Sequence, residues 1–291
     1  MHPGRPSRTA LAVAGLRAAH QIMDGPVVFA DPVALPILGP GAEARIRSDE
    51  ARLHTPTVRF LRASVVARSR FAEDTLATAV ADGARQYVVL GAGLDTFAYR
   101  NPYPDLRVFE VDHPATQAWK RDMLAAAGIL PPSSVAYAGV DFERDTLAEG
   151  LARAGFDRNR PAFVAWLGVA IYLTRDAILD TLRAIAALPV GSGIVFDYSL
   201  PPDTLSEKQR AAFQAMADRA AAEGEAWRSF FIPETLAADL SAVGFGTVTD
   251  VGAAELNPRY FAGRTDGLGL GGISRLAHAA VTSPSPIAPG L

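Results

Sequence analysis

Two glycines and an aspartate are the residues whose types and spacing most strongly predict chemistry in this sequence. Gly91 and Gly93 come directly after the apolar run from Tyr87 to Leu90, in the segment VVLGAGLDT. Without a Cβ atom, glycine lets the chain turn sharply after a strand and lets the backbone approach a ligand. Asp112 follows Gly91 by 21 residues, at the end of the next apolar run. A carboxylate there can accept hydrogen bonds from both hydroxyls of a ribose, so the pattern predicts a nucleoside site.

Two kinds of cofactor use a nucleoside site of this layout. A dinucleotide site favours a third glycine, with the pyrophosphate at the start of the following helix. Here that position holds Thr96, and Asp95 adds a negative charge beside it. S-adenosylmethionine carries no phosphate, so an acidic loop is compatible with it. The residues therefore favour S-adenosylmethionine over NAD(P), and a simple tight turn between a strand and a helix stays open as a third interpretation.

Alternating apolar and amphipathic segments indicate which elements hold these residues. Continuous apolar runs are typical of strands that are buried on both faces of a sheet. We expect strands over residues 87–90, 106–111, 134–140, 163–167 and 193–196. Helix start and stop signals predict helices over residues 114–127, from 174 to before 189, over 206–222, and from 233 to a stop at 244. This alternation of strands and helices predicts an α/β fold with a doubly wound, mostly parallel, Rossmann-like sheet.

The two ends of the chain differ in composition from this α/β unit. The sequence before about residue 72 is mostly helical, which predicts a single domain over 9–280 with a helical cap over 9–72 and an α/β core over 73–280. Residues 1–8 hold two prolines and a glycine, and residues 281–291 hold three prolines and no charged side chain. We expect both segments to be mobile extensions.

The composition excludes several classes of protein. A hydrophobic share of 49% with 20% charged residues is not that of a disordered or fibrous chain. The 28 basic and 31 acidic residues give a net charge of −3, so no basic excess indicates nucleic-acid binding. The sequence has no cysteine, and its five histidines lack the spacing of metal ligands, so we expect no metal site. No apolar segment has the length of a membrane span, and we expect a cytoplasmic protein.

Several segments of the sequence together resemble one known family. They are TALAVAGLRAAH (9–20), FADPVA (29–34), RSRFAED (68–74), QYVVLGAGLDTFAYR (86–100), FEVDHPATQ (109–117), VDF (140–142), WLGVAIYLT (166–174) and YFAGRTDGL (260–268). The chain resembles the leucine carboxyl methyltransferase-like family of class I S-adenosylmethionine-dependent methyltransferases, which includes bacterial polyketide O-methyltransferases. The resemblance runs from Thr9 to about Ala280. It implies the class I methyltransferase fold, S-adenosylmethionine as cofactor and S-adenosylhomocysteine as product.

The resemblance also implies which residues bind the cofactor. Arg68 matches an arginine that grips the carboxylate of the methionine part, where a guanidinium can donate two parallel hydrogen bonds. Asp112 matches the acid that binds the ribose, and Asp141 matches the acid that accepts from the adenine amino group. The remaining matches are Gly91 and Gly93 under the methionine part, Phe142 beside the adenine ring and Thr9 near the cofactor carboxylate.

One departure from the family pattern concerns the acceptor end of the site. Better-known members carry a glutamate before the glycine that follows the fourth strand, whereas this chain has Leu167 before Gly168. The acceptor therefore stays open between a hydroxyl and a carboxyl group. A carboxylate needs no base, whereas a hydroxyl must lose its proton to one. Our candidates for catalytic residues are Tyr172 and His113.

Simpler interpretations of these residues also stay open. Arg68 and the nearby Arg70 could form surface ion pairs with the acids at positions 73 and 74. Asp141 and His113 could each cap a helix, and Tyr172 could serve core packing.

Asp197 and Tyr198, at the end of another expected strand, are further candidates for a base.

Together, the residues and the resemblance predict an S-adenosylmethionine-dependent O-methyltransferase. We expect it to act on a hydroxyl or carboxyl group of a small molecule, such as a polyketide or another secondary metabolite. We expect no nucleic-acid or membrane partner, and the sequence does not indicate the oligomeric state. The alternatives are an NAD(P)-dependent oxidoreductase and a protein that binds S-adenosylmethionine without catalysis.

Overall fold

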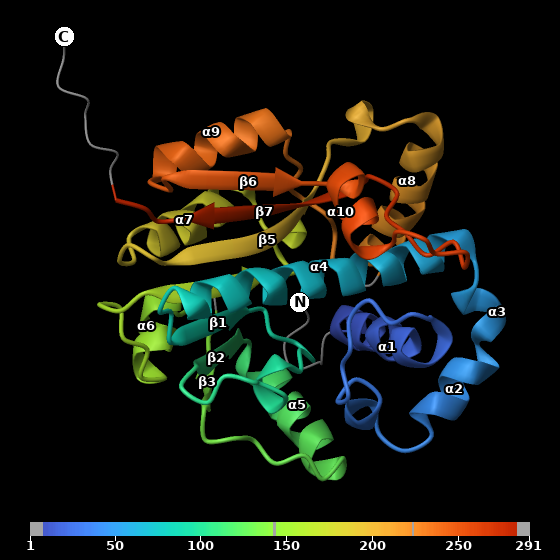
Figure 1. Cartoon of the computed structure of the whole chain (residues 1–291), viewed down its shortest axis with the longest axis horizontal. Helices are drawn as coiled ribbons and strands as arrows, with labels where there is room; N and C mark the ends of the chain where they lie inside the picture. The colour runs from blue at the N-terminus through green and yellow to red at the C-terminus, as the bar shows by residue number, and fades with distance from the viewer. Residues whose placement is uncertain (1–7, 142–143, 223, 284–291) are drawn as a thin grey trace.

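A seven-stranded sheet lies at the centre of the computed structural model, which describes residues 8–141, 144–222 and 224–283 (Figure 1). The strands are β1 (Gln86–Leu90), β2 (Arg107–Asp112), β3 (Val135–Gly139), β4 (Ala162–Trp166), β5 (Gly193–Ser199), β6 (Thr247–Val251) and β7 (Ser274–Ala280). Their spatial order is β3-β2-β1-β4-β5-β7-β6. The first five strands in this order are parallel, and β7 pairs antiparallel with β5 and β6. The strand order reverses between β1 and β4, where sheets of this kind bind ligands beside the carboxyl ends of the strands.

Helices cover both faces of the sheet. Along β1, Val88 and Leu90 pack on one face, and Tyr87 and Val89 pack on the other. The first face is covered by α6 (Leu147–Arg153), α7 (Arg175–Ala186) and α9 (Pro233–Val243). The second face is covered by α4 (Pro56–Ala81), α5 (Pro114–Ala126) and α10 (Ala253–Tyr260). Burial on both faces explains why the central strands consist of continuous apolar residues.

A buried ion pair joins α5 to β2. Glu110 and Lys120 are both 1% exposed, and Lys120 Nζ lies 2.7 Å from Glu110 Oε2. Burial raises the pKa of Glu110, although the neighbouring Lys120 acts in the opposite direction. Removing either partner would leave the other charge buried and unpaired, which is costly. The pair therefore fixes α5 against the strand that ends at Asp112.

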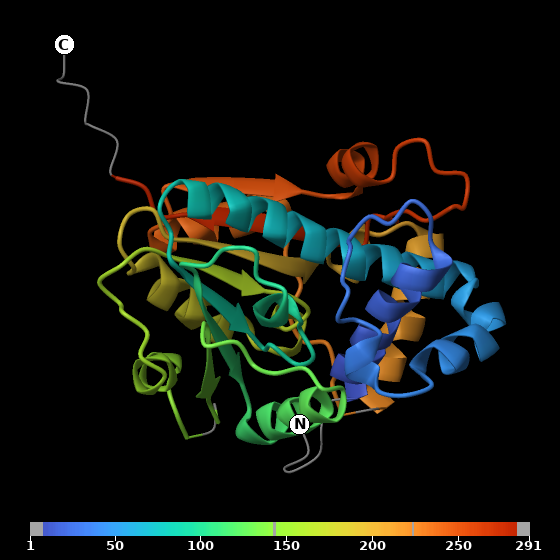
Figure 2. The ribbon, with the colours of Figure 1, turned by 60° about the horizontal axis from the view of Figure 1, so that its bottom comes forward.

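The N-terminal helices form a cap beside the sheet. They are α1 (Arg8–Met23), the 3₁₀ turn η1 (Pro36–Leu38), α2 (Ala42–Ser48) and α3 (Glu50–Leu53). The long helix α4 connects this cap to the sheet, because its first half lies beside α1 and its second half lies beside the strands (Figures 1 and 2). The remaining elements are η2 (Phe97–Tyr99), η3 (Ala170–Tyr172), η4 (Pro202–Thr204) and α8 (Glu207–Ala222).

The predicted α/β fold with N-terminal helices is confirmed, with differences in detail. The five expected strands correspond to β1–β5, whereas β6 and β7 were not predicted. Helix α4 runs across the boundary expected between residues 72 and 73, so one continuous helix belongs to both the cap and the core. Helix α1 begins at Arg8, the last residue of the segment expected to be mobile; residues 1–7 and 284–291 lie outside the described residues. In the described part of the chain, no helix has the length and apolar character that a membrane crossing requires.

Candidate functional site

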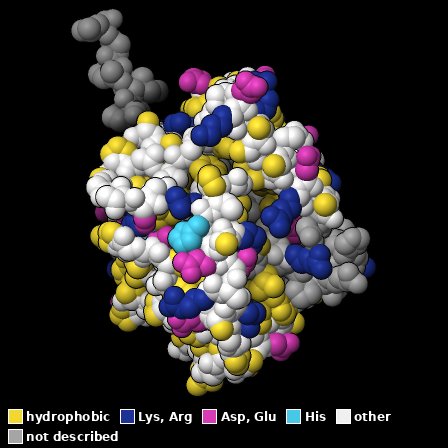
Figure 3. Space-filling model, turned by 90° about the vertical axis from the view of Figure 1, so that its right-hand side faces the viewer, with side chains coloured by type: hydrophobic (Ala, Val, Ile, Leu, Met, Phe, Trp, Pro, Cys, Tyr) yellow, Lys and Arg dark blue, Asp and Glu magenta, His cyan; other side chains and the backbone are white. Residues whose placement is uncertain are grey.

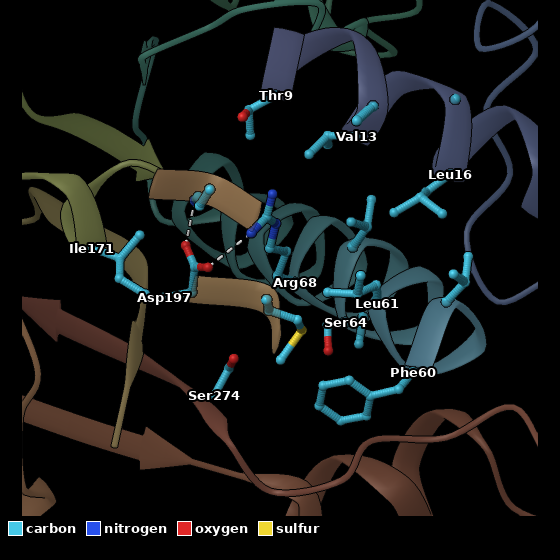
Figure 4. Close-up of a pocket in the computed structure, with 18 of the residues that line it drawn as sticks. Thr9, Val13, Leu16, Phe60, Leu61, Ser64, Arg68, Ile171, Asp197 and Ser274 are labelled. Atoms are coloured by element: carbon cyan, nitrogen blue, oxygen red, sulfur yellow. Dashed lines mark hydrogen bonds and ion pairs between the residues drawn. The ribbon is translucent and has the colours of Figure 1, made fainter. Parts of the chain in front are cut away.

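A cavity of about 710 Å³ lies between the cap and the carboxyl ends of β4 and β5. Its polar end holds Thr9 of α1, Arg68 of α4 and Asp197 of β5 (Figure 4). The rest of the lining is mainly apolar and includes Leu16, Leu61, Val65, Ile171, Met216 and Trp227. Charged side chains of α2, α3 and α8, among them Arg45, Arg52 and Arg219, also line it. A concave site of this size, with more apolar than polar lining, is typical of small-molecule sites.

An ion pair forms the polar end of the cavity. Arg68 Nη1 donates to Asp197 Oδ2 at 2.9 Å, and the backbone N–H of Gly168 donates to Asp197 Oδ1 (Figure 4). The side chains of Arg68 and Asp197 are 17% and 16% exposed, so the pair is largely shielded from water. Gly168 has φ +73°, and a Cβ atom there would lie 2.5 Å from Arg68 Nη2. The close approach of the guanidinium therefore requires a glycine after Leu167.

Of Arg68 and Arg70, only Arg70 forms an ion pair with one of the acids at positions 73 and 74. Arg70 Nε lies 2.7 Å from Asp74 Oδ1, on the exposed side of α4. Glu73 instead pairs with Arg100, which follows η2. Arg68 takes neither of these acids as its partner and points into the cavity (Figure 4).

The two glycines after β1 lie close to helix α1 and to the segment after β4. Gly91 has φ +64° and Gly93 has φ +46°, a backbone region that favours glycine. A Cβ atom on Gly91 would lie 2.4 Å from Cγ2 of Val169, and one on Gly93 would lie 3.1 Å from Cβ of Ala10. Neither glycine lines the cavity, although Val169 does. The glycine loop and the cavity are thus neighbours, separated by the side chain of Val169.

Asp112 lies beside the glycine loop at the end of β2. Its Oδ2 accepts the N–H of Gly93 at 2.6 Å, and its Oδ1 accepts the N–H of His113 at 2.7 Å. The residue is 9% exposed. Burial raises its pKa, and the hydrogen bonds from Gly93 and His113 act in the opposite direction. The two backbone donors hold the carboxylate in a fixed position beside the glycine loop.

Asp141 follows β3, the strand next to β2. The N–H of Val140 donates to the backbone oxygen of Asp112 at 3.0 Å, so the two acids stand at adjoining strand ends. The helix-cap interpretation of Asp141 does not apply to α6, because Thr146 caps that helix and accepts from the N–H of Glu149. Phe142, the other residue expected at the adenine, lies outside the described residues.

The two candidate catalytic residues lie in different surroundings. Tyr172, in η3, lines the cavity, and burial followed by the charge of Glu225 raises the pKa of its phenol. The hydroxyl therefore stays protonated at neutral pH and can donate a hydrogen bond. His113 does not line the cavity; its Nδ1 accepts the N–H of Ala115 at 3.2 Å and caps α5. The structure does not bring these two side chains together.

A buried network that the sequence analysis missed joins the cap to the glycine loop. Thr96 Oγ1 donates to Asp31 Oδ2 at 2.6 Å, and Arg17 Nε lies 2.8 Å from the same carboxylate. Arg17 Nη2 also donates to the backbone oxygen of Leu94. Thr96 is fully buried and Asp31 is 2% exposed. The presence of FADPVA among the family-like segments was the available signal for Asp31, but nothing local in the sequence indicated its partners.

The same loop explains why a dinucleotide fits this site poorly. Asp95 Oδ1 accepts the N–H of Phe97 at 2.8 Å, so a carboxylate already binds the start of η2. A pyrophosphate needs the free N–H groups of a helix N-terminus and no negative charge beside them. Among the residues described, no group of three or more possible metal ligands occurs.

Comparison with known proteins gives a consistent result. The sequence model of the family described as leucine carboxyl methyltransferase matches residues 10–186. A Bacillus subtilis protein named "Putative S-adenosyl-L-methionine-dependent methyltransferase YktD" is 30% identical over 291 aligned residues, which cover 92% of this chain and 95% of that protein. A Mycobacterium marinum protein named "Putative S-adenosyl-L-methionine-dependent methyltransferase" is 34% identical over 260 residues, covering 84% of this chain and 79% of that protein.

A solved structure resembles the whole fold. The crystal structure of a "putative methyltransferase" from Thermobifida fusca superposes with a TM-score of 0.57, covering 97% of each chain. The two sequences are 19% identical, so this likeness concerns the fold alone.

Proposed function

The chain belongs to the leucine carboxyl methyltransferase family of S-adenosylmethionine-dependent methyltransferases, and we propose that it methylates an oxygen atom of a small, largely apolar molecule. The observation that carries the proposal is the cavity beside the ends of β4 and β5. Its charged end, with Arg68 and Asp197, suits the amino-acid part of the cofactor. Its apolar part, which residues of α1, α4 and α8 line, suits the acceptor.

We propose that the chain's own residues mainly bind, orient and exclude water. Bound S-adenosylmethionine supplies a methyl group on a positively charged sulfur, which needs no further activation. Arg68 and Thr9 bind the carboxylate of its methionine part, Asp112 the ribose, and Asp141 the adenine amino group. Gly91 and Gly93 let the backbone of their loop approach the cofactor. Holding two reactants in line can lower the free-energy barrier of such a transfer by about 7–11 kcal/mol. The cap keeps water away from the methyl group.

The cavity lining supports an acceptor oxygen that is already ionised. Two acids line the cavity in the described part of the chain, Asp49 and Asp197, and each pairs with an arginine. Tyr172 stays protonated at neutral pH because burial raises the pKa of its phenol. A neutral alcohol would need a base. We therefore propose a carboxylate, or an acidic phenol or enol of the kind found in polyketides, as the acceptor.

A methyl-transfer assay with radiolabelled methyl donor tests this function. The protein is incubated with methyl-tritiated S-adenosylmethionine and matched apolar carboxylic acids, acidic phenols and simple alcohols. We expect label in products from the first two groups only. Treatment with dilute base then separates the two classes, because a methyl ester releases methanol and an aryl methyl ether does not.

Two outcomes would contradict the proposal. Binding of S-adenosylhomocysteine without transfer to any acceptor of the panel would favour a protein that binds the cofactor without catalysis. Calorimetric binding of NADH, with no binding of S-adenosylmethionine, would favour an oxidoreductase. The variant Asp239→Asn serves as a control for general effects of losing an ion-paired acid, because Asp239 is partly buried and pairs with Arg175 outside the cavity.

A further inference from the structure

Asp197 lies beside Gly168, just after β4, where the residue before the glycine is Leu167 rather than an acid. Its carboxylate comes from β5, the strand next to β4, and accepts the N–H of Gly168. Leu167, the residue before that glycine, does not line the cavity and packs against the apolar cluster of α4 that contains Phe71. The carboxylate that binds the backbone after β4 therefore comes from the neighbouring strand, β5.

We infer that Asp197 binds the α-ammonium group of the cofactor's methionine part, so that Arg68 and Asp197 together form a site for an α-amino acid zwitterion. This inference rests on the proposed function, because it assumes that S-adenosylmethionine binds in the cavity. It assigns to Asp197 a binding role that the sequence motifs did not indicate.

The geometry of the pair suits two opposite charges on one carbon atom. An α-amino acid carries a carboxylate and an ammonium group, and the cavity offers a guanidinium and a carboxylate 2.9 Å apart. In the hydrogen bonds of the described residues, Arg68 uses only Nη1, so its other N–H groups can donate to a ligand carboxylate. Asp197 Oδ1 and Oδ2 each accept one donor, and a carboxylate can accept about four.

The pair also avoids the cost of a shielded charge that has no partner of opposite sign. A shielded charge without a partner is costly, and Arg68 and Asp197 neutralise each other when no ligand is bound. When an α-amino acid binds, its carboxylate faces Arg68 and its ammonium faces Asp197, so every charge keeps an opposite neighbour. A ligand that carries only one of the two charges leaves this network incomplete.

A role of Asp197 as a general base is the competing interpretation. Both of its oxygens already accept from donors that belong to the protein, and Gly168 and Arg68 hold them in place. The two roles differ in what they affect. A base acts on the acceptor and changes the rate of transfer, whereas an ammonium-binding acid changes the affinity for the cofactor itself.

Calorimetry with two ligands separates these roles. The ligands are S-adenosylhomocysteine and its desamino analogue, in which hydrogen replaces the α-amino group. For the unmodified protein we expect the desamino analogue to bind about 10–100-fold more weakly, the range for losing a hydrogen bond between charged groups. For Asp197→Asn we expect S-adenosylhomocysteine to weaken by a similar factor, while the affinity for the desamino analogue changes by less than about threefold.

The matched control is Asp239→Asn, which removes a carboxylate from an Arg–Asp pair outside the cavity. We expect it to bind both ligands as the unmodified protein does. If Asp197→Asn keeps the full preference for S-adenosylhomocysteine, the inference is wrong. If that variant lowers only the transfer rate, the base interpretation replaces it.

The unmodified protein provides a test that does not depend on the folding of a variant. Equal affinity for S-adenosylhomocysteine and its desamino analogue would overturn the inference and leave the proposed function standing. A protein that binds neither ligand would overturn both. A clear preference for the ligand with the ammonium group supports the zwitterion site even if Asp197→Asn does not fold.

Discussion

At the scale of single residues, the proposed ribose-binding role of Asp112 rests on a carboxylate that backbone donors hold in place. Gly93 and His113 donate to its two oxygens, so the carboxylate is fixed before any ligand arrives. We expect Asp112→Ala to weaken the binding of S-adenosylhomocysteine by about 1–3 kcal/mol in calorimetry, the scale for losing hydrogen bonds to a charged group. The exposed Asp122→Ala on α5 should bind normally. Unchanged affinity in a folded Asp112 variant would remove the ribose role.

Thr96 has a structural task that is separate from ligand binding. Its hydroxyl donates to the buried carboxylate of Asp31 and so ties the glycine loop to the cap. Thr96→Val keeps the volume but removes the donor, and we expect a loss of about 1–3 kcal/mol in the free energy of unfolding by urea. Thr78→Val, at an exposed position of α4, is the control and should cost far less. Equal losses in the two variants would contradict this assignment.

The residues of the site differ in how far the sequence could predict them. Gly91, Gly93 and Asp112 are found by local spacing, because each follows an apolar strand. Asp197 meets Arg68 across 129 positions and Asp31 meets Thr96 across 65, so no local pattern brings these pairs together. The consequence of Leu167 becomes visible only when β5 is placed beside β4.

At the scale of elements, one buried acid fixes α1 to α4. Asp24 accepts from Arg62 Nε at 2.6 Å and Nη2 at 2.9 Å, and His20 Nδ1 lies 2.8 Å from the same carboxylate. His20 Nε2 accepts the N–H of Val28, so Nδ1 carries the hydrogen that faces Asp24. Burial alone would raise the pKa of Asp24, but the hydrogen bonds from His20 and Arg62 outweigh it and lower the pKa to about 2.

This lowered pKa makes the cap sensitive to acid. A folded-state pKa below the ordinary value of 3.8 means that the carboxylate stabilises the folded protein at neutral pH, by about 2 kcal/mol. The contribution is lost as the pH falls from about 4 towards about 2. We expect urea denaturation to show a shallower loss of stability over that range for Asp24→Asn than for the unmodified protein. Parallel pH profiles would contradict this, and the exposed Glu43→Gln should match the unmodified profile.

The elements that the sequence analysis missed have physical reasons for being missed. Strand β6 is exposed or only partly buried at every position, so it lacks an apolar run. Strand β7 contains Arg275 and His278, which break the pattern of a buried strand although β7 lies between β5 and β6. The continuous helix α4 was divided at residue 72 because the mostly helical region before that residue was expected to lie outside the alternating strands and helices.

At the scale of the whole molecule, the surface charge is mixed. On the face in Figure 3, which is the right-hand side of Figure 1, basic and acidic side chains lie among one another. The net charge of −3 agrees with this view. A field of one sign is what non-specific nucleic-acid binding needs. These observations fit the proposed small-molecule acceptor, whose site lies inside the protein rather than on a charged face.

The shared helix α4 also determines how the molecule should unfold. Phe71 and Leu76 belong to the apolar cluster of the sheet, whereas Ala63 and Val58 belong to clusters of the cap. Separating the cap from the core would break α4 or expose one of these surfaces. We therefore expect a single calorimetric transition, with equal calorimetric and van't Hoff enthalpies, as a single cooperative unit requires.

Limited proteolysis provides the second measurement for the same expectation. If the cap and the core unfold together, cleavage of the whole chain should release no stable fragment that begins near residue 73. S-adenosylhomocysteine should raise the midpoint of this single transition, because the cavity proposed as its binding site is lined by both the cap and the core. Two separate transitions, or a protease-resistant core without α1, would show that the expected division at residue 72 marks two independent domains.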